Sequence, residues 1–233
     1  FPPHPDVIKL ATINATVNQV NAQRMSLISQ EPKNFRASFT DDAAKIFGRT
    51  LPAETDLQLK VGAQVMFIKN DDSSMMKAPT GGTIKRWVNG TIGHVVDLPK
   101  SGIVIVEVDG EQFDVGPATW EKVRYEVEEE FDEASGKLKE TLVPITLAEF
   151  KQIPLRLAWA VTIHKSQGQT YDEVQIDMGR GAFSPGQTYV ALSRVRALEG
   201  LYLTRAITMA DVMVDQDVIR FMSGGQSVTT SSE

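Results

Sequence analysis

Small hydrogen-bonding residues are concentrated in one stretch, TIHKSQGQT at residues 162 to 170, directly after a run of apolar chain. Its lysine supplies a positive charge for a phosphate group, and its threonine and serine supply hydroxyls. Its glycine lets the backbone approach a ligand closely, and its glutamine both donates and accepts. The residues concerned are Thr162, Lys165, Ser166, Gln167 and Gly168. A polar turn would explain any one of them, but together they predict an anion-binding site.

The loop follows residues 155 to 161, LRLAWAV, which are apolar on both sides apart from Arg156. This pattern is typical of a strand covered on both faces, as in a parallel sheet. In such sheets ligands bind beyond the carboxyl ends of the strands, where loops and helix N-termini present N–H groups. We therefore expect residues 162 to 170 at a ligand-binding edge.

The start of the chain has a strand-helix-strand pattern. Residues 6 to 12 read as a strand, Asn14 as the N-cap of a helix, and residues 35 to 40 as a second strand by alternation. The predicted helix has residues at helical spacing along one side, namely Val17, Val20, Arg24, Leu27 and Ile28.

A second α/β portion begins near Pro154. Residues 173 to 178, EVQIDM, read as a strand, and residues 184 to 187, SPGQ, form a capping box that predicts a helix reaching Val195. Residues 201 to 204 read as a third strand. We therefore expect one α/β domain with a parallel sheet, built from both ends of the chain.

The middle of the chain carries short β-rich runs. Asp109-Gly110 lies between two alternating runs and predicts a two-residue hairpin, and two further runs surround Ser135-Gly136. This spacing predicts a small antiparallel barrel or sandwich. The predicted division is residues 1–58 and 154–222 for the α/β domain, 59–153 for the inserted barrel, and 223–233 for a tail of disordered composition.

Composition limits the function classes. The chain has 233 residues, 42% of them apolar, no cysteine and three histidines, which predicts a globular protein without a zinc or other metal site of its own. No apolar run approaches the roughly 20 residues of a membrane helix, so we expect no membrane partner and a reducing, cytoplasmic setting. Because the chain begins at Phe1, we expect it to be part of a longer protein.

The net charge of -6 argues against binding to nucleic acid. However, residues 126–133, EVEEEFDE, hold six acids and no base, so the charge of the rest of the chain is balanced. Such a run is typical of a solvated strand face or loop. Local charge must therefore decide which partners bind.

Two stretches resemble a known family. IPLRLAWAVTIHKSQGQTYDEV and GQTYVALSRVRALEGLYL are similar to motifs V and VI of the superfamily-one DNA helicases, in the branch of the RecD-like and petite-integration-frequency helicases. LATINATVNQVNAQRM resembles the motif IV region, and LKVGAQVMFIKND with WVNGTIGHVV resembles the start of that family's Src-homology-3-like barrel. The resemblance spans residues 6 to 208 and implies a RecA-like second motor domain interrupted by the barrel.

The phosphate-binding loop G-x-x-x-x-G-K-[ST] is absent from the sequence. The resemblance therefore implies that ATP and Mg²⁺ are bound mainly by a first motor domain outside this chain, and that the chain alone is inactive. Its implied partners are that domain and single-stranded DNA, with roles in DNA repair or recombination and a cytoplasmic location, nucleoid-associated in a bacterium.

The resemblance also implies roles for single residues. Arg194 would be the arginine finger that stabilises the γ-phosphate in the transition state. Gln167 and Gly168 would line the nucleotide cleft. The expected contacts with DNA phosphates, or links between the two sites, are Thr162, His164, Lys165 and Ser166.

Further nucleic-acid contacts are expected elsewhere. Thr12 and Asn14 follow the first strand and are candidates for backbone phosphate contacts. Lys85, Arg86 and Trp87 place two cations beside an aromatic ring, a combination used to hold single strands, although Trp87 fits the barrel core equally well. Two alternatives stay open: a non-catalytic single-strand-binding module, and an α/β enzyme acting on a small phosphate ester, for which no acid or base is evident near the loop.

Overall fold

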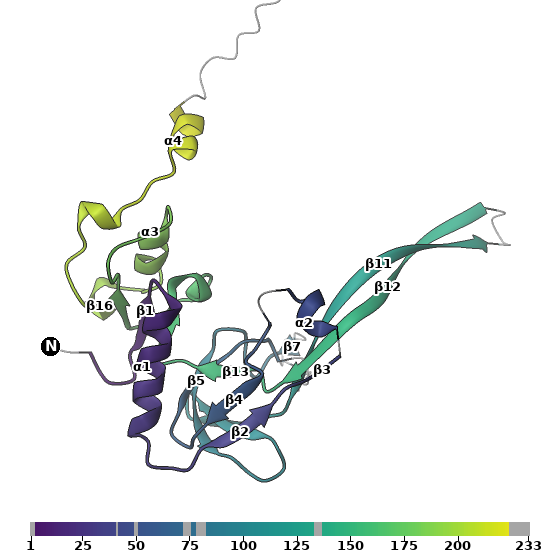
Figure 1. Cartoon of the computed structure of the whole chain (residues 1–233), viewed down its shortest axis with the longest axis horizontal. Helices are drawn as coiled ribbons and strands as arrows, with labels where there is room; N and C mark the ends of the chain where they lie inside the picture. Colours follow the sequence, from purple (N-terminus) through teal and green to yellow (C-terminus); the bar gives the residue numbers. More distant parts are fainter. Residues whose placement is uncertain are drawn as a thin grey trace, which may run out of the picture. The chain divides into compact units, whose positions relative to one another are not determined.

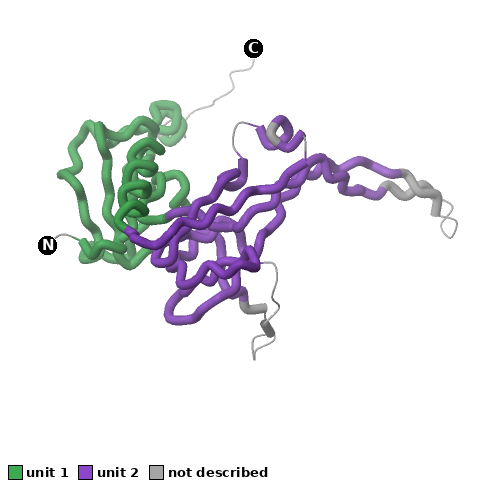
Figure 2. The backbone as a smooth tube through the Cα atoms, turned by 60° about the horizontal axis from the view of Figure 1, so that its bottom comes forward, with its two compact units in different colours: residues 1–27, 158–233 green, residues 28–157 purple. Residues whose placement is uncertain are grey.

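The computed structural model describes residues 3–40, 42–48, 51–71, 76–77, 83–132 and 137–223. It contains a parallel sheet and antiparallel sheets, and the chain divides into two compact units (Figure 2). Unit 1 comprises residues 1–27 and 158–233, and unit 2 comprises residues 28–157. The domains predicted from the sequence divide the chain differently, and that division stays a prediction.

Unit 1 is built on a four-stranded sheet in which every neighbouring pair is parallel. Its order is β14 (Ala160–Thr162), β1 (Ile8–Ala11), β15 (Val174–Asp177), β16 (Leu201–Leu203). Every described residue of β14, and all but one of β1, is buried, as expected for a sheet covered on both faces. The predicted parallel sheet is confirmed.

Helix α1 (Asn14–Leu27) lies against this sheet (Figure 1). Its Val17 packs with Ala11 and Ala160. The buried positions of α1 are Val17, Asn21 and Met25, spaced four residues apart. The predicted stripe is therefore wrong at Leu27, which is 72% exposed. The other helical elements of unit 1 are η1 (Ile163–Ser166), α3 (Gln187–Leu192), η2 (Leu198–Gly200), η3 (Met209–Asp211) and α4 (Gln216–Ser223).

The single strand predicted over residues 155 to 161 is wrong, because the structure contains two. β13 (Leu155–Leu157) pairs antiparallel with β5 (Gln64–Phe67) in unit 2, whereas β14 pairs parallel with β1 in unit 1. Apolar side chains on both faces indicate burial, but they do not reveal that consecutive segments are buried in different sheets.

The capping box predicted at Ser184 is also wrong. Helix α3 begins after Gly186, whose φ of 75° is left-handed, and the side chain of Gln187 accepts a hydrogen bond from the Phe183 N–H instead. The helix ends at Leu192 rather than Val195, because the following residues pair with Tyr171. The predicted helical position of Arg194 is therefore wrong as well.

Unit 2 contains a five-stranded antiparallel sheet in the order β10-β9-β8-β5-β13. The additional strands are β8 (Ile92–Asp97), β9 (Val104–Val108) and β10 (Glu111–Val115). Asp109 and Gly110 have φ of 51° and 83°, which confirms the predicted hairpin turn. These pairings establish an antiparallel sheet, and the closed small barrel stays a prediction.

A long two-stranded ribbon extends from unit 2 (Figure 1). It consists of β11 (Ala118–Asp132) and β12 (Lys137–Gln152), and the predicted turn at Ser135-Gly136 lies outside the described residues. β3 (Ser38–Phe39) pairs with the base of β12. The remaining elements are β2 (Lys33–Arg36), β4 (Asp56–Leu59), β6 (Met76–Lys77), β7 (Thr83–Ile84) and α2 (Ala43–Ile46).

The expectation that residues 35 to 40 belong to the parallel sheet is wrong, since β2 pairs antiparallel with β4 and β3 pairs antiparallel with β12. Alternation showed a half-buried strand, but alternation carries no information about the partner strand. Of the predicted tail, Ser223 closes α4 and the other residues lie outside the described part of the chain.

Candidate functional site

Polar residues gather at the carboxyl edge of the parallel sheet in unit 1. Ala11, the last residue of β1, lies opposite Thr162 on one side and Asp177 on the other. Thr204 follows β16, and its hydroxyl lies 3.3 Å from Asp177 Oδ1. The edge at which α/β sheets bind ligands therefore carries hydroxyl and carboxylate groups from three strands.

The loop after β14 is shaped by its own hydroxyl groups. Thr162 Oγ1 accepts a hydrogen bond from the Lys165 N–H at 3.4 Å, which caps η1. Ser166 is fully buried, and its hydroxyl donates to the carbonyl of Ile163 at 2.8 Å. These two side chains hold the turn in place and leave its outer side to their neighbours.

The outer side of the turn is exposed to solvent. His164, Lys165, Gln167 and Gly168 are all exposed, and the His164 ring lies 6.0 Å from the ring of Phe183. Gly168 has a φ of 78°, which disfavours other residues, and a Cβ built there meets no atom within 4 Å. This short turn therefore exposes a cation, an imidazole, an amide and open backbone, which are groups that can bind an anion.

Arg194 lies against this loop. Its Nη1 donates to the carbonyls of Gln169 at 2.9 Å and Ser166 at 3.4 Å, and its Nε donates to the carbonyl of Val190 at 2.9 Å. Its Nη2 donates to the Ser193 hydroxyl at 2.9 Å. Within the described residues Arg194 forms no ion pair, so its positive charge is held only by neutral acceptors.

Tyr171 connects the loop to the segment that carries Arg194. Its N–H donates to the Arg194 carbonyl at 2.8 Å, and its carbonyl accepts from the Arg196 N–H at 3.1 Å. Burial raises the pKa of Tyr171 to about 12, an effect that the nearby charge of Arg194 partly offsets. The loop and the arginine segment are thus joined by backbone as well as by the guanidinium.

The two residues predicted after β1 differ in exposure. Thr12 is 6% exposed, and its Oγ1 lies 3.6 Å from the position that a Cβ on Gly179 would occupy. Asn14 is exposed and is the first residue of α1. Both lie at the same edge as Thr162, and their role in binding phosphate stays a prediction.

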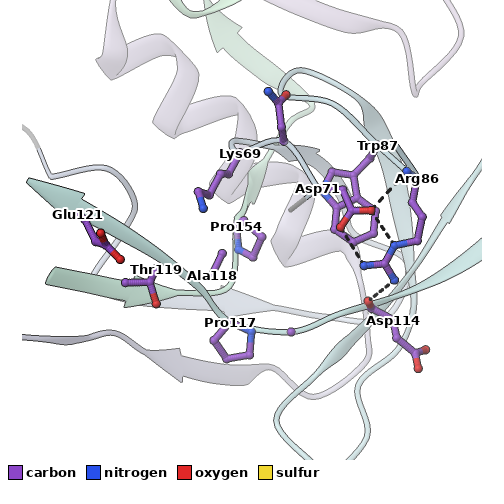
Figure 3. A pocket seen from close by; sticks show the side chains of 12 residues that line it. Lys69, Asp71, Arg86, Trp87, Asp114, Pro117, Ala118, Thr119, Glu121 and Pro154 are labelled. Carbon is purple, nitrogen blue, oxygen red and sulfur yellow. Dashed lines mark hydrogen bonds and ion pairs between the residues drawn. The ribbon is translucent and has the colours of Figure 1, made fainter. Parts of the chain in front are cut away.

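Lys85, Arg86 and Trp87, the KRW stretch, lie in unit 2. The side chains of Arg86 and Trp87 contact other residues of that unit (Figure 3). Arg86 forms two bonds with the carboxylate of Asp71, Nε to Oδ2 at 2.9 Å and Nη2 to Oδ1 at 3.0 Å. Trp87 is 7% exposed and stacks on Phe67 with ring centroids 4.5 Å apart. Trp87 thus occupies the core position that the sequence left open, while Lys85 is exposed.

Sequence reasoning missed two residues that support the site. Asn21 holds β14 through its side-chain amide, and a polar residue in step with Val17 and Met25 along α1 was the available signal. Asp71 holds Arg86, and no local pattern indicates that pairing because the two residues are fifteen positions apart.

Comparisons with known proteins agree with the resemblance of the two stretches to helicase motifs. No family model matches the chain. The chain is 35% identical over 170 residues to the ATP-dependent DNA helicase Pif1 of Bdellovibrio bacteriovorus, covering 73% of this chain and 32% of that protein. It therefore spans about a third of the length of that curated relative.

Solved structures give the same result. Unliganded Pif1 from Bacteroides sp. matches with a TM-score of 0.74 and 31% identity, over 97% of this chain and 47% of that one. Bacteroides Pif1 in complex with ADP-AlF3 and single-stranded DNA matches with a TM-score of 0.66 and 30% identity, over 98% and 47%. The family resemblance of the two motif stretches is confirmed.

Proposed function

We propose, from the premise that the chain is a homologue of Pif1-type superfamily-one helicases, that it is the second motor domain of an ATP-dependent DNA helicase. In this proposal it supplies the arginine finger and part of the contacts with single-stranded DNA. The observation that carries the proposal is the position of Arg194. Its guanidinium donates to two carbonyls of the 162–170 loop and has no carboxylate partner among the described residues.

The surroundings of Arg194 suit a group that acts on a phosphate. A guanidinium bonds more strongly to a charged phosphate oxygen than to a neutral carbonyl or hydroxyl, so a γ-phosphate would compete well with its present acceptors. Charge stabilisation of this kind contributes about 10³ to 10⁵ in rate in nucleotide hydrolases. Gln167 and Gly168, exposed on the same loop, would line the nucleotide cleft.

ATP and Mg²⁺ are the proposed cofactors, and the names of the relatives mention ATP and ADP-AlF3. Arg194 and Lys165 have the chemistry to hold phosphate oxygens. Within the described residues, however, no group of three or more His, Cys, Asp or Glu side chains is placed to hold a metal ion. We therefore assign Mg²⁺ and the phosphate cradle to a part of the parent protein outside this chain.

Single-stranded DNA is the proposed polymer. His164 and Lys165 are exposed and would contact its phosphates, with Thr162 and Ser166 holding the turn that presents them. Thr12 and Asn14 at the same edge would add polar contacts. Lys85 is the exposed member of the KRW stretch, and in this proposal Arg86 and Trp87 position it.

The finer fold assignment belongs to the same proposal. Residues 1–58 and 154–222 would form the RecA-like domain, and residues 59–153 the inserted Src-homology-3-like barrel, which the antiparallel strands β5, β8, β9 and β10 support. None of the described helices has the length and apolarity to cross a bilayer. DNA repair or recombination in the cytoplasm, at the nucleoid in a bacterium, is the setting that the proposal implies.

The test compares two arginines in the longer parent protein. Arg194→Ala should lower kcat for DNA-stimulated ATP hydrolysis by about 10³-fold or more, with nucleotide affinity nearly unchanged. Arg196→Ala is the matched control, because Arg196 pairs with Asp172 on the surface, 65% and 81% exposed, and should leave kcat within a few-fold.

Two results would overturn the proposal. One is full turnover in the Arg194→Ala parent, and the other is robust ATP hydrolysis by the 233-residue chain alone. The alternative of a non-catalytic single-strand-binding module predicts no turnover in the parent itself, and homology to ATP-dependent helicases does not favour it.

A further inference from the structure

One pocket in unit 2 is lined by three cationic side chains. Its volume is about 350 Å³, and its charged lining residues are Lys33, Arg36 and Lys151. Its polar lining residues are Asn34, Ser38 and Gln152, and the rest of the lining is Phe35, Gly102, Pro117 and Ile153. Within the described part of the chain, none of its lining residues is acidic, although the whole chain carries a net charge of -6. The pocket is therefore a local positive site on an acidic protein.

Three strands bring these side chains together. Asn34 and Arg36 lie two residues apart on β2, where side chains on one face repeat every ~6.6–6.8 Å. Ser38 on β3 lies opposite Lys151 on β12. Asn34, Arg36, Ser38 and Lys151 thus come from separate parts of the chain, whereas Lys33 alternates with Asn34 along β2 and lies on the face of Phe35.

The three charges are only weakly neutralised. Arg36 pairs with Asp56 at 3.3 Å, but the two side chains are 87% and 69% exposed, and such surface pairs contribute little. The Lys33 ammonium donates to the Pro99 carbonyl and lies 5.2 Å from the centre of the Phe35 ring, both neutral groups. Lys151 is exposed and forms no ion pair with any described residue.

A larger pocket in unit 2 carries acidic as well as basic side chains. Its volume is about 660 Å³, and its lining includes Asp71, Asp114 and Glu121 beside Lys69 and Arg86 (Figure 3). Arg86 is already bonded to Asp71 there. A phosphate would meet net negative charge in that pocket, so the smaller one is the better anion site.

We propose that the pocket formed by Lys33, Arg36, Ser38 and Lys151 binds phosphate groups of a nucleic-acid strand, as a contact separate from the 162–170 loop. The assignment to nucleic acid rests on the proposed helicase function, whereas the anion chemistry rests on the pocket itself. Arg36 and Lys151 are the two exposed cations and supply most of the attraction.

The experiment measures binding of a labelled oligodeoxythymidylate of about 16 nucleotides to the chain by fluorescence anisotropy. Salt is varied between about 50 and 200 mM. The test variant is Arg36→Gln with Lys151→Gln. The matched control is Arg124→Gln with Lys122→Gln, because Arg124 also pairs with an exposed acid, Glu126, and both residues lie on β11 outside the pocket.

Each neutralised phosphate contributes roughly 0.7 to the slope of log affinity against log salt, so the test variant should lower the slope by about 1.4. The control variant should keep the wild-type slope and affinity. Equal effects in the two variants, or an unchanged slope in the test variant, overturn the proposal. Absence of oligonucleotide binding to the wild-type chain overturns it as well.

A third variant, Lys165→Gln, separates this proposal from the proposed function. If Lys165→Gln weakens binding and the pocket variant does not, the pocket proposal fails and the loop assignment stands. If only the pocket variant weakens binding, the pocket is a phosphate site and the DNA role of the loop fails. Tighter binding of inorganic polyphosphate than of the oligonucleotide would overturn the assignment to nucleic acid.

Discussion

The side chain of Asn21 on α1 forms hydrogen bonds with the edge strand β14 of the parallel sheet. We expect its replacement by alanine to destabilise unit 1. Its Nδ2 donates to the Ala160 carbonyl at 3.0 Å, and its Oδ1 accepts from the Ala160 N–H at 2.9 Å. Among the described strands β14 has a neighbour on only one side, and on the other side Asn21 bonds to its backbone as a strand would. Ala160 is fully buried, so no water replaces the lost amide.

The size of the effect follows from those two bonds. Leaving a buried donor or acceptor without a partner costs about 1–3 kcal/mol each. Alanine recovers about 0.6 kcal/mol through its higher helix propensity. The two groups together cost about 2–6 kcal/mol, so the net loss is about 1.4–5.4 kcal/mol. This is a substantial part of the roughly 5–15 kcal/mol that typically stabilises a folded domain.

Amide hydrogen exchange at Ala160, together with urea unfolding, measures this effect. Asn18→Ala is the matched control, because Asn18 is exposed on the same helix and its replacement removes no buried bond. We expect Asn21→Ala to remove protection at Ala160 while Asn18→Ala keeps it. Unchanged protection and stability in Asn21→Ala would refute the reasoning.

Two further predictions concern stability. Arg86→Met should cost about 3–5 kcal/mol, because the Asp71 side chain is 1% exposed and would lose both of its bonds to the Arg86 guanidinium. Thermal unfolding checks this, and lost DNA binding at unchanged stability would instead indicate a direct contact. Since the pKa of Tyr171 is raised from 10.0 to about 12, the folded chain keeps a proton that the unfolded chain releases. The contribution of Tyr171 to the free energy of unfolding is therefore fully present below pH 10. It should fall by about 2–3 kcal/mol as the pH rises to about 12. Urea unfolding across this range should show the fall in the wild type, and a fall of equal size in Tyr171→Phe would contradict the assignment.

Local backbone structure was predictable from the sequence. The Asp109-Gly110 turn follows from the positive φ that a two-residue hairpin requires, and β1 and β15 follow from buried apolar runs. The partner of each strand was not predictable, because the same apolar run fits either sheet. Residues 155–161 belong to two sheets for that reason.

The candidate site was predictable in part. The resemblance to helicase motifs V and VI indicated that the 162–170 loop and Arg194 serve one function. In the structure the two are in contact. The acceptors that hold Arg194 are mostly backbone carbonyls, which leave no trace in residue identity. Trp87 beside two cations has the composition of a stacking platform, and only its contact with Phe67 reveals a core residue.

The strand order of unit 1 has a consequence for how the chain folds during synthesis. β1, near the start, lies between β14 and β15, which are made about 150 residues later. Unit 2 is one uninterrupted segment and can complete its sheets before β14 and β15 have left the ribosome. Unit 1 must wait for its distant halves to meet, so we expect it to be the slower-folding unit and α1 to stay exposed to chaperones until β14 emerges.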